Sequence, residues 1–597
     1  MHPTALRRAA VRALLLPALL LPALAALADP SRGAAPAKDS SPAALVRQVA
    51  DAYVAESVRR SPQLAEQVGT PTPVDRWTDN TPKALRAWEA RQDAFLAQLS
   101  SVDAAALQGT PEWLVHGMLR EALEAERAQR VCRLELWRGV DQIFGWHLGL
   151  TQAAAEQPVG TKAQRAQALT RWRALPGFVR TELANAREGL ARGYSVPRPN
   201  VERVIEQLEG MIAQAPERSP FWSPAERSGS PAFQKQWTEV LRRDVFPQLV
   251  SFRDFLKKEY LPRARLESGL SALPEGAACY RAIVRAYSSL DVSPEELQKR
   301  AQEARKGLEA ELAPLVRRLT GHEDLREGRR VLATDARFAF GSREKKVEQT
   351  RAELERVRGL VTRAFSRIPE TPVVLEVAAA FREASSPPAW YEPAPLDGSR
   401  AASYFLNLGG AETSPRMGLA PSVAHEAWPG HHLQIAWLRE RSVAHPVLRL
   451  LSTAAFVEGW GMYAERLAFE TRMFEDELMH AGLLGHLTDA LVALELDPGM
   501  HVFGVTREQA VQTMMTVSSR PRAEAERYAD RHASTPGQLA TYMTGYLELM
   551  RLREEARSAL GERFDLREFH DVVLGDGPLA LPLLRQKLER WVAAKKT

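Results

Sequence analysis

The stretch Ser422-Val-Ala-His-Glu-Ala-Trp-Pro-Gly-His-His-Leu-Gln434 decides how this chain is interpreted, because it places three histidines and a glutamate within eight residues. Neutral imidazoles can hold a catalytic metal ion on a helix, and an adjacent carboxylate can take a proton from water. His425 and Glu426 therefore predict a metal-dependent hydrolase. The alternative is a helix that carries surface histidines.

The spacing in this stretch predicts a break in the helix. The usual motif has its second histidine four residues after the first, but that position is Pro429. Proline has no N–H to donate to the preceding turn, and Gly430 tolerates an unusual backbone. If Trp428 and Pro429 loop outward, His431 reaches the second ligand position. Without a bulge, His432 shares a face with the first histidine about 10 Å away, so the residues alone leave both histidines open.

A third ligand is predicted on a second apolar helix, between Pro446 and Phe474. This segment carries Glu458 and Glu465 two turns apart on one face. An acid in such an apolar setting needs a partner, and a metal ion is one that suffices. Glu458 follows His431 by 27 positions, which is compatible with a helix that returns across the first.

Two glycines in the same segment predict close packing. Gly459 and Gly461 each cost a helix about 1 kcal/mol relative to alanine, so we expect another backbone to approach here. The alternative interpretation of Glu458 is a salt bridge to Arg466 or Arg449.

The two strings His425-Glu-Ala-Trp-Pro-Gly-His431 and Glu458-Gly-Trp-Gly-Met-Tyr-Ala-Glu465 resemble the signature blocks of the bacterial "domain of unknown function 885" family. The family pattern is H-E-x-x-P-G-H followed by E-G-W-x-x-Y-x-E, and the resemblance runs from about residue 40 to the end. It implies an α-helical fold similar to the gluzincin peptidases, such as angiotensin-converting enzyme and thimet oligopeptidase, and it favours His431 over His432. Further matching positions are Tyr528, Pro536-Gly537-Gln538, Tyr542, Gly545, Phe569-His570-Asp571 and Gly577.

The predicted cofactor is one zinc ion held by His425, His431 and Glu458, a ligand set that leaves a fourth position for water. Glu426 is the predicted general base. Tyr542, which matches the family pattern, is the predicted donor to the oxyanion, with a core tyrosine as the alternative.

Residues around this set have predicted supporting roles. Arg527, Arg551 or Arg553 is a candidate for binding the C-terminal carboxylate of a substrate, which would make the enzyme a carboxypeptidase. Glu465 and His570 are expected to contact the ligands without binding the metal.

The N-terminus predicts export to the periplasm or the exterior. Residues 1–28 contain three arginines, an apolar run of about 15 residues and the cleavage signature Ala26-Leu27-Ala28, which is typical of a signal peptide. The apolar run is shorter than the roughly 20 residues of a membrane span. Residues 29–43 are predicted to be a flexible lead-in. No cysteine follows the cleavage point, so the sequence does not support a lipid anchor.

Charge and cysteine content restrict the partners. The formal net charge of +5 includes three arginines of the signal peptide, which leaves 5 − 3 = +2 for the mature chain. This charge is too small to indicate a nucleic-acid-binding surface. Cys132 and Cys279 can form a disulfide after export, although the sequence does not establish their proximity. The oligomeric state stays open.

Apolar spacing predicts a mainly α fold of long helices, which usually build solenoid-like or bilobal structures. With the resemblance, this implies a large, bilobal, metallopeptidase-like helical fold, with an N-terminal helical lobe over 44–270 and a catalytic lobe over 271–597. A small β-sheet is predicted just before the metal helix, from strands at Pro372–Val377 and Ala401–Leu408. Its edge could bind an extended peptide, or it could be a hairpin that caps the core. Helices are expected over 43–60, 83–99, 113–130, 161–191, 198–215, 233–260, 294–319 and 344–368.

Together these features predict an exported zinc metallopeptidase. Two alternatives remain: a hydrolase with the same site that acts on a non-peptide amide or ester, and a metal-stabilised binding protein without catalysis. The presence of Glu426, which is not needed as a ligand, favours catalysis.

Overall fold

The structure is a computed structural model that describes residues 41–70, 72–378, 383, 387–395, 398 and 400–597. The expected signal peptide (1–28) and the lead-in up to residue 40 lie outside the described residues. Residues Pro42–Thr597 form one compact unit. Because the first helix begins at Pro42, the last two residues of the expected lead-in are helical. The division into lobes at residue 270 stays a prediction.

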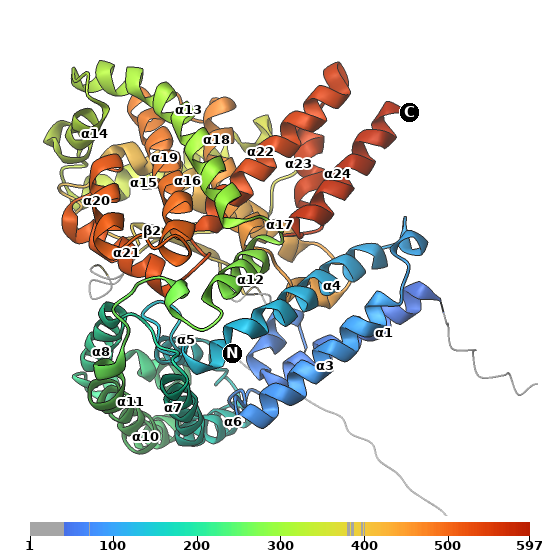
Figure 1. Ribbon diagram of the computed structural model, residues 1–597, viewed down its shortest axis with the longest axis vertical. Helices are drawn as coiled ribbons and strands as arrows, with labels where there is room; N and C mark the ends of the chain where they lie inside the picture. Colours follow the sequence, from blue (N-terminus) through green and yellow to red (C-terminus); the bar gives the residue numbers. More distant parts are fainter. Residues whose placement is uncertain (1–40, 71, 379–382, 384–386, 396–397, 399) are drawn as a thin grey trace, which may run out of the picture. The chain divides into compact units, whose positions relative to one another are not determined.

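The fold is mainly α-helical, as the apolar spacing predicted (Figure 1). The first half contains α1 Pro42–Arg60, α2 Ala65–Val68, α3 Pro82–Ser100, α4 Glu112–Gln129, α5 Trp146–Glu156, α6 Lys162–Arg173, α7 Leu175–Ala191, α8 Arg198–Ile212, α9 Ser223–Arg227, α10 Pro231–Val240, α11 Phe246–Phe255 and α12 Gly276–Ser288. The second half contains α13 Pro294–Thr320, α14 Leu325–Thr334, α15 Arg343–Arg358, α16 Leu419–Glu426, α17 His431–Glu440, α18 Ala454–Glu470, α19 Glu477–His501, α20 Arg507–Val517, α21 Arg522–Ser534, α22 Ala540–Leu560, α23 Leu566–Leu574 and α24 Leu581–Lys596.

Some of the long predicted helices are interrupted. The segment 161–191 is two helices, since α7 starts afresh at Leu175 with a proline in its first turn. The segment 233–260 contains π-helical turns at Leu241–Val245 and Leu256–Tyr260, each just before a residue pair that contains a proline. The segment that starts near residue 344 is helical only to Arg358, and the predicted helix at 446–474 is α18 preceded by a short 3-10 turn.

A three-stranded mixed sheet lies just before α16 in the chain. It contains β1 Val373–Val377, β2 Ala389–Glu392 and β3 Ala402–Leu406, in the order β1-β3-β2. β3 is parallel to β1 and antiparallel to β2, so the two predicted strands are confirmed but do not form a hairpin with each other. The short strand β2 was not predicted, and it contacts α16.

Close packing of helices surrounds the second signature block. Helix α18 packs against α16 and α22, and α19 packs against α13 and α22; these helices lie together in Figure 1. A Cβ atom on Gly459 would lie 2.5 Å from the Cα of Gly545, and one on Gly545 would lie 1.7 Å from the carbonyl oxygen of Ala455. The backbone approach predicted at Gly459 is therefore confirmed.

Cys132 and Cys279 form a disulfide that closes a loop of 147 residues. Both residues are buried, and the bond joins the segment after α4 to α12. The disulfide that the sequence allowed but did not establish is therefore present.

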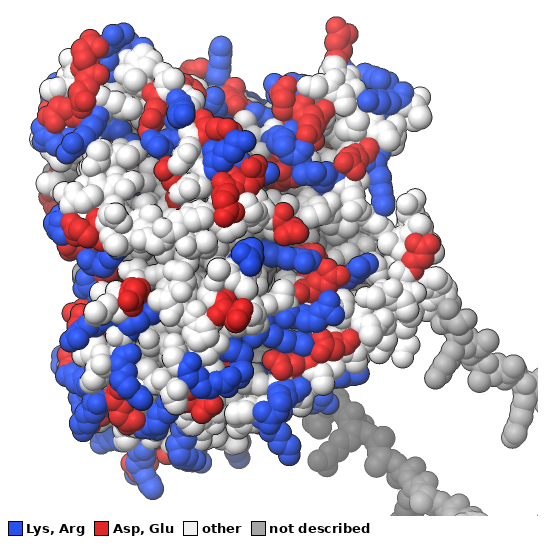
Figure 2. Space-filling view, in the orientation of Figure 1, with Lys and Arg blue, Asp and Glu red and all other residues white. Residues whose placement is uncertain are grey.

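Figure 2 shows Lys and Arg intermixed with Asp and Glu over the face in view. Among the described residues, no helix is both long enough and apolar enough to cross a membrane.

Candidate metal centre

The break in the first signature block places its second histidine. Helix α16 ends at Glu426 and α17 begins at His431. A Cβ atom on Gly430 would lie 1.9 Å from the carbonyl oxygen of the first histidine, so only glycine fits there. The Nε1–H of Trp460 in α18 donates to the carbonyl of Pro429 at 3.0 Å, which ties the two blocks together.

The direction of this break differs from the expectation. Trp428 does not loop out of the protein but is buried at 2% exposure, with its ring centroid 4.5 Å from that of His432. His432 is fully buried, and its two ring nitrogens face the Tyr391 hydroxyl and the Thr371 carbonyl. It therefore points away from the site, and His431 is the histidine that joins the first one.

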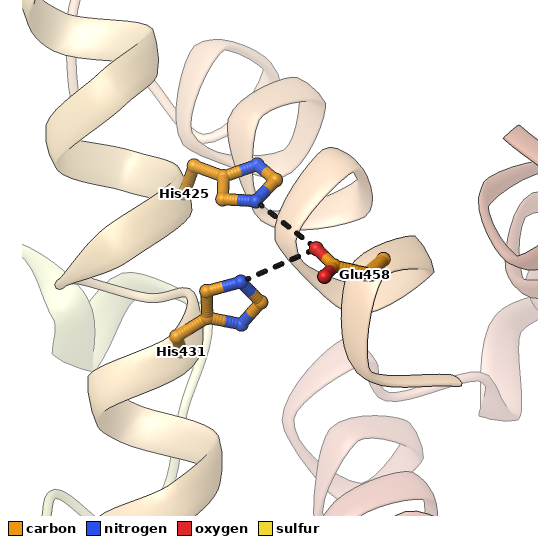
Figure 3. A group of neighbouring side chains, drawn as sticks. All are labelled: His425, His431 and Glu458. Carbon is orange, nitrogen blue, oxygen red and sulfur yellow. Dashed lines mark ion pairs between the residues drawn. The ribbon is translucent and has the colours of Figure 1, made fainter. Parts of the chain in front are cut away.

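Three side chains from three helices converge on one point, as Figure 3 shows: His425 from the end of α16, His431 from the start of α17, and Glu458 from α18. Their ligand atoms all lie within 4.8 Å of one another. The Nε2 atoms of His425 and His431 lie 3.8 Å and 3.6 Å from Oε2 of Glu458. The alternative interpretation, a salt bridge from Glu458 to Arg466 or Arg449, is therefore wrong, because the partners of Glu458 are the two histidines.

These separations fit a shared metal ion. Tetrahedral zinc with bonds of about 2.0–2.2 Å holds its ligand atoms about 3.3–3.6 Å apart. A direct N–H···O hydrogen bond would be shorter, at about 2.7–3.2 Å. Distances of 3.6 and 3.8 Å to Glu458 are nearer to the first arrangement than to the second. The donor set of two imidazoles and a carboxylate also suits zinc.

Three carboxylates determine the charge around His425. Burial opposes ionisation of His425, but Glu458, Glu465 and Glu426 outweigh this effect and hold its pKa well above the usual range. Burial would raise the pKa of Glu458, but both histidines outweigh burial and lower it, so this carboxylate is ionised at neutral pH. Negative charge therefore surrounds the point where the ligand atoms meet.

Glu465 orients the first ligand. Its side chain is fully buried, and Oε1 accepts a hydrogen bond from Nδ1 of His425 at 2.8 Å, which leaves Nε2 free to face the site. The other oxygen, Oε2, accepts a hydrogen bond from Nδ1 of His486 in α19 at 2.9 Å. The expected supporting role of Glu465 agrees with this geometry.

Replacing Glu465 by glutamine is expected to weaken zinc binding by about 10- to 100-fold, because the amide is a weaker acceptor and orients His425 less firmly. Competition with a chromophoric chelator measures the zinc dissociation constant. Glu475→Gln, at a residue beyond the end of α18 that is 68% exposed, is the matched control and should bind zinc like the wild type. Equal affinity in Glu465→Gln would contradict the orienting role.

Glu426 lies next to the ligands and is half-buried. Its charge acts on the pKa of His425 and of Tyr404 in β3, so the carboxylate lies near both residues. Within the described part of the chain, no side chain forms a hydrogen bond or an ion pair with it. A carboxylate in this position is free to accept a proton.

Tyr542 in α22 borders the site. Its ring centroid lies 6.3 Å from that of His425, and the two rings are stacked at 25°. Burial raises the pKa of its hydroxyl above the usual range, and the charge of Glu458 raises it further. The phenol is therefore protonated at neutral pH and can donate a hydrogen bond.

Other predicted residues lie elsewhere. The ring nitrogens of His570 face the Tyr463 hydroxyl and the Ala364 carbonyl, so these two contacts do not reach the ligands as was expected. Arg553 pairs with Glu470, Arg551 pairs with Glu548 and Glu555, and Arg527 is exposed on α21. Two of the three candidate arginines are thus already neutralised by carboxylates.

Two residues near the site were missed from the sequence. His486 stands alone in the apolar run Leu483–Leu487 of α19, and this isolation was the only local signal for it. Arg531 lies one turn after Arg527 on α21, donates a hydrogen bond to Gln538 and acts on the pKa of the Tyr542 hydroxyl. Nothing in the local sequence distinguishes it from the other arginines of that helix.

Comparisons with known proteins agree with this fold. A candidate lipoprotein from Colwellia psychrerythraea superimposes with a TM-score of 0.85 at 22% identity, over 93% of this chain and 100% of that one. A candidate lipoprotein of unknown function from Shewanella oneidensis gives 0.71 at 21% identity, over 91% and 99%. No curated protein matches the chain. The family described as "Bacterial protein of unknown function (DUF885)" matches residues 62–588. This protein therefore belongs to the DUF885 family.

Proposed function

We propose that the protein is an exported zinc-dependent metallopeptidase that hydrolyses peptides. The observation that carries this proposal is the convergence of His425, His431 and Glu458 beside the free carboxylate of Glu426. His425, His431 and Glu458 would hold the zinc ion, which when bound would supply Lewis acidity for a carbonyl group and for water.

The side chains of the protein would move the protons. Glu426 accepts a proton from the attacking water as the oxygen bonds to the carbonyl carbon, and it passes that proton to the amine nitrogen when the C–N bond breaks. Tyr542, which stays protonated, donates a hydrogen bond to the oxyanion.

The sheet supports a peptide as the substrate. β2 is an edge strand that pairs only with β3 in the described sheet, and it contacts α16. An extended peptide can add to such an edge through main-chain hydrogen bonds and so reach the end of α16. The ligands, the base and β2 all belong to the expected catalytic lobe over 271–597.

Export is supported by three features. The N-terminus has the pattern of a signal peptide. The Cys132–Cys279 disulfide is typical of an oxidising compartment. Both structural relatives are described as candidate lipoproteins, a class found outside the cytoplasm.

Elemental analysis of the wild type and His425→Ala, with peptide hydrolysis assayed alongside, tests the proposal. We expect about one zinc per chain in the wild type, and loss of both zinc and hydrolysis in His425→Ala. His322→Ala, at an exposed histidine, is the control and should keep both. A folded wild type that stays free of zinc after reconstitution would overturn the proposal. Turnover of esters alone would point to a non-peptide hydrolase, and zinc without turnover would point to a binding protein.

A further inference from the structure

We infer that Arg531 binds a carboxylate group of the substrate beside the candidate metal centre, so that the protein releases residues from the free carboxyl end of peptides. This inference rests on the proposed peptidase function and specifies its substrate class. Its basis is the guanidinium group of Arg531, which is half-buried, lacks a counter-ion and, like the metal ligand His425, lies near Tyr542.

The surroundings of Arg531 leave its charge uncompensated. Its Nη2 donates to Oε1 of Gln538, a neutral group, at 3.0 Å. Its Nε is buried without a hydrogen-bond partner among the described residues, and none of their carboxylates lies within ion-pair distance. By contrast, Arg466 in α18 pairs with Glu311, and Arg553 in α22 pairs with Glu470.

Tyr542 connects Arg531 to the metal ligands. Arg531 donates to Gln538, four residues before Tyr542; the charge of Glu458 raises the pKa of the Tyr542 hydroxyl, and Arg531 and Gln538 lie near enough to lower it. The ring of Tyr542 stacks beside His425 with centroids 6.3 Å apart. An extended peptide spans about 3.3–3.6 Å per residue. A guanidinium one tyrosine side chain away from the ligands is therefore in reach of a carboxylate about one or two residues beyond the cleaved bond.

The chemistry of the group selects its ligand. A guanidinium presents planar N–H donors that match the two oxygens of a carboxylate, and such pairs are shorter and stronger than neutral hydrogen bonds. A charge shielded from water without a partner is costly, so a substrate anion that supplies the partner gains affinity. Gln538, which accepts a hydrogen bond from Arg531, holds the guanidinium group in place. The C-terminal carboxylate and an acidic side chain share this chemistry.

Two matched peptide libraries distinguish these sources: one with free C-terminal carboxylates and one with C-terminal amides, with products identified by mass spectrometry. We expect the wild type to prefer the free-acid library by roughly 100-fold or more in kcat/KM. Arg531→Gln should lose most of this preference, mainly through KM, and keep its zinc. Arg531→Lys should show an intermediate preference for the free-acid library, because lysine has a positive charge but lacks the planar set of N–H donors. Arg522→Gln, at the exposed arginine that begins α21, should match the wild type.

The outcomes separate this inference from the proposed function. Cleavage of amides only next to acidic side chains, lost in Arg531→Gln, supports carboxylate binding by Arg531 but overturns release from the free carboxyl end, because an acidic side chain is then the source of the carboxylate. Equal cleavage of both libraries by the wild type, or an unchanged preference in Arg531→Gln, overturns the inference and leaves the peptidase standing. Cleavage of neither library by zinc-loaded protein overturns the proposed function, and the inference with it.

Discussion

Glu426→Gln is expected to abolish most peptide hydrolysis while leaving zinc bound. The amide keeps the size of the side chain but cannot accept a proton at neutral pH, and a positioned general base contributes about 10²- to 10⁴-fold to the rate. We therefore expect kcat to fall by roughly 10³-fold. The zinc content should stay at the wild-type level, because His425, His431 and Glu458 are untouched.

The conservative variant Glu426→Asp sharpens this test. It retains a carboxylate on a shorter side chain and should recover part of the lost rate, which a purely structural role would not explain. The measurements are steady-state kinetics on a cleaved peptide and elemental analysis of the same samples. If zinc-loaded Glu426→Gln kept hydrolysis within a factor of ten of the wild type, the base would have to be another residue.

Gly461→Ala in α18 is expected to weaken metal binding, because the added methyl group would clash with His425 in α16. An added Cβ atom would lie 2.6 Å from both Nε2 and Cε1 of His425, closer than real Cβ contacts come. The ring cannot move away easily, because its Nδ1 is held by the buried carboxylate of Glu465. Overpacking of this kind costs typically about 1–3 kcal/mol, which corresponds to a zinc affinity lower by roughly 10- to 100-fold.

A control on another helix isolates the effect of this contact. Gly307→Ala in α13 adds a Cβ with nothing within 4 Å, so it should leave zinc affinity unchanged and favour the helix slightly. Chelator competition gives the dissociation constants, and circular dichroism checks the fold of both variants. A zinc affinity of Gly461→Ala equal to that of Gly307→Ala would mean that His425 is not held against this glycine.

The residue types of the candidate site were predictable because they lie in two short blocks. His425, Glu426 and Glu458 were identified from their chemistry and spacing, and the helix break from Pro429 and Gly430. The choice between the two downstream histidines was not open to the same reasoning. Adjacent residues on a helix point in different directions, and a break of unknown geometry changes both directions at once.

Apolar periodicity predicted the mainly α fold but not its interruptions. A π turn adds one residue to a helical turn, so the apolar residues on either side of Leu241–Val245 and Leu256–Tyr260 keep a helical spacing and are offset from an unbroken helix by only one position. β2 is only four residues long, and its Ala-Trp-Tyr-Glu sequence has no alternation to reveal it. The strands that were predicted, β1 and β3, carry β-branched and aromatic residues.

The sequence by itself determined the helical class, the position of the break and the donor types of the candidate metal centre, because local spacing and side-chain chemistry suffice for these. Only the tertiary structure decided which groups surround them. Glu465 reaches His425 across 40 positions in sequence, and His486 reaches the same carboxylate from α19. Such contacts depend on how whole helices pack, and packing is set by many residues at once.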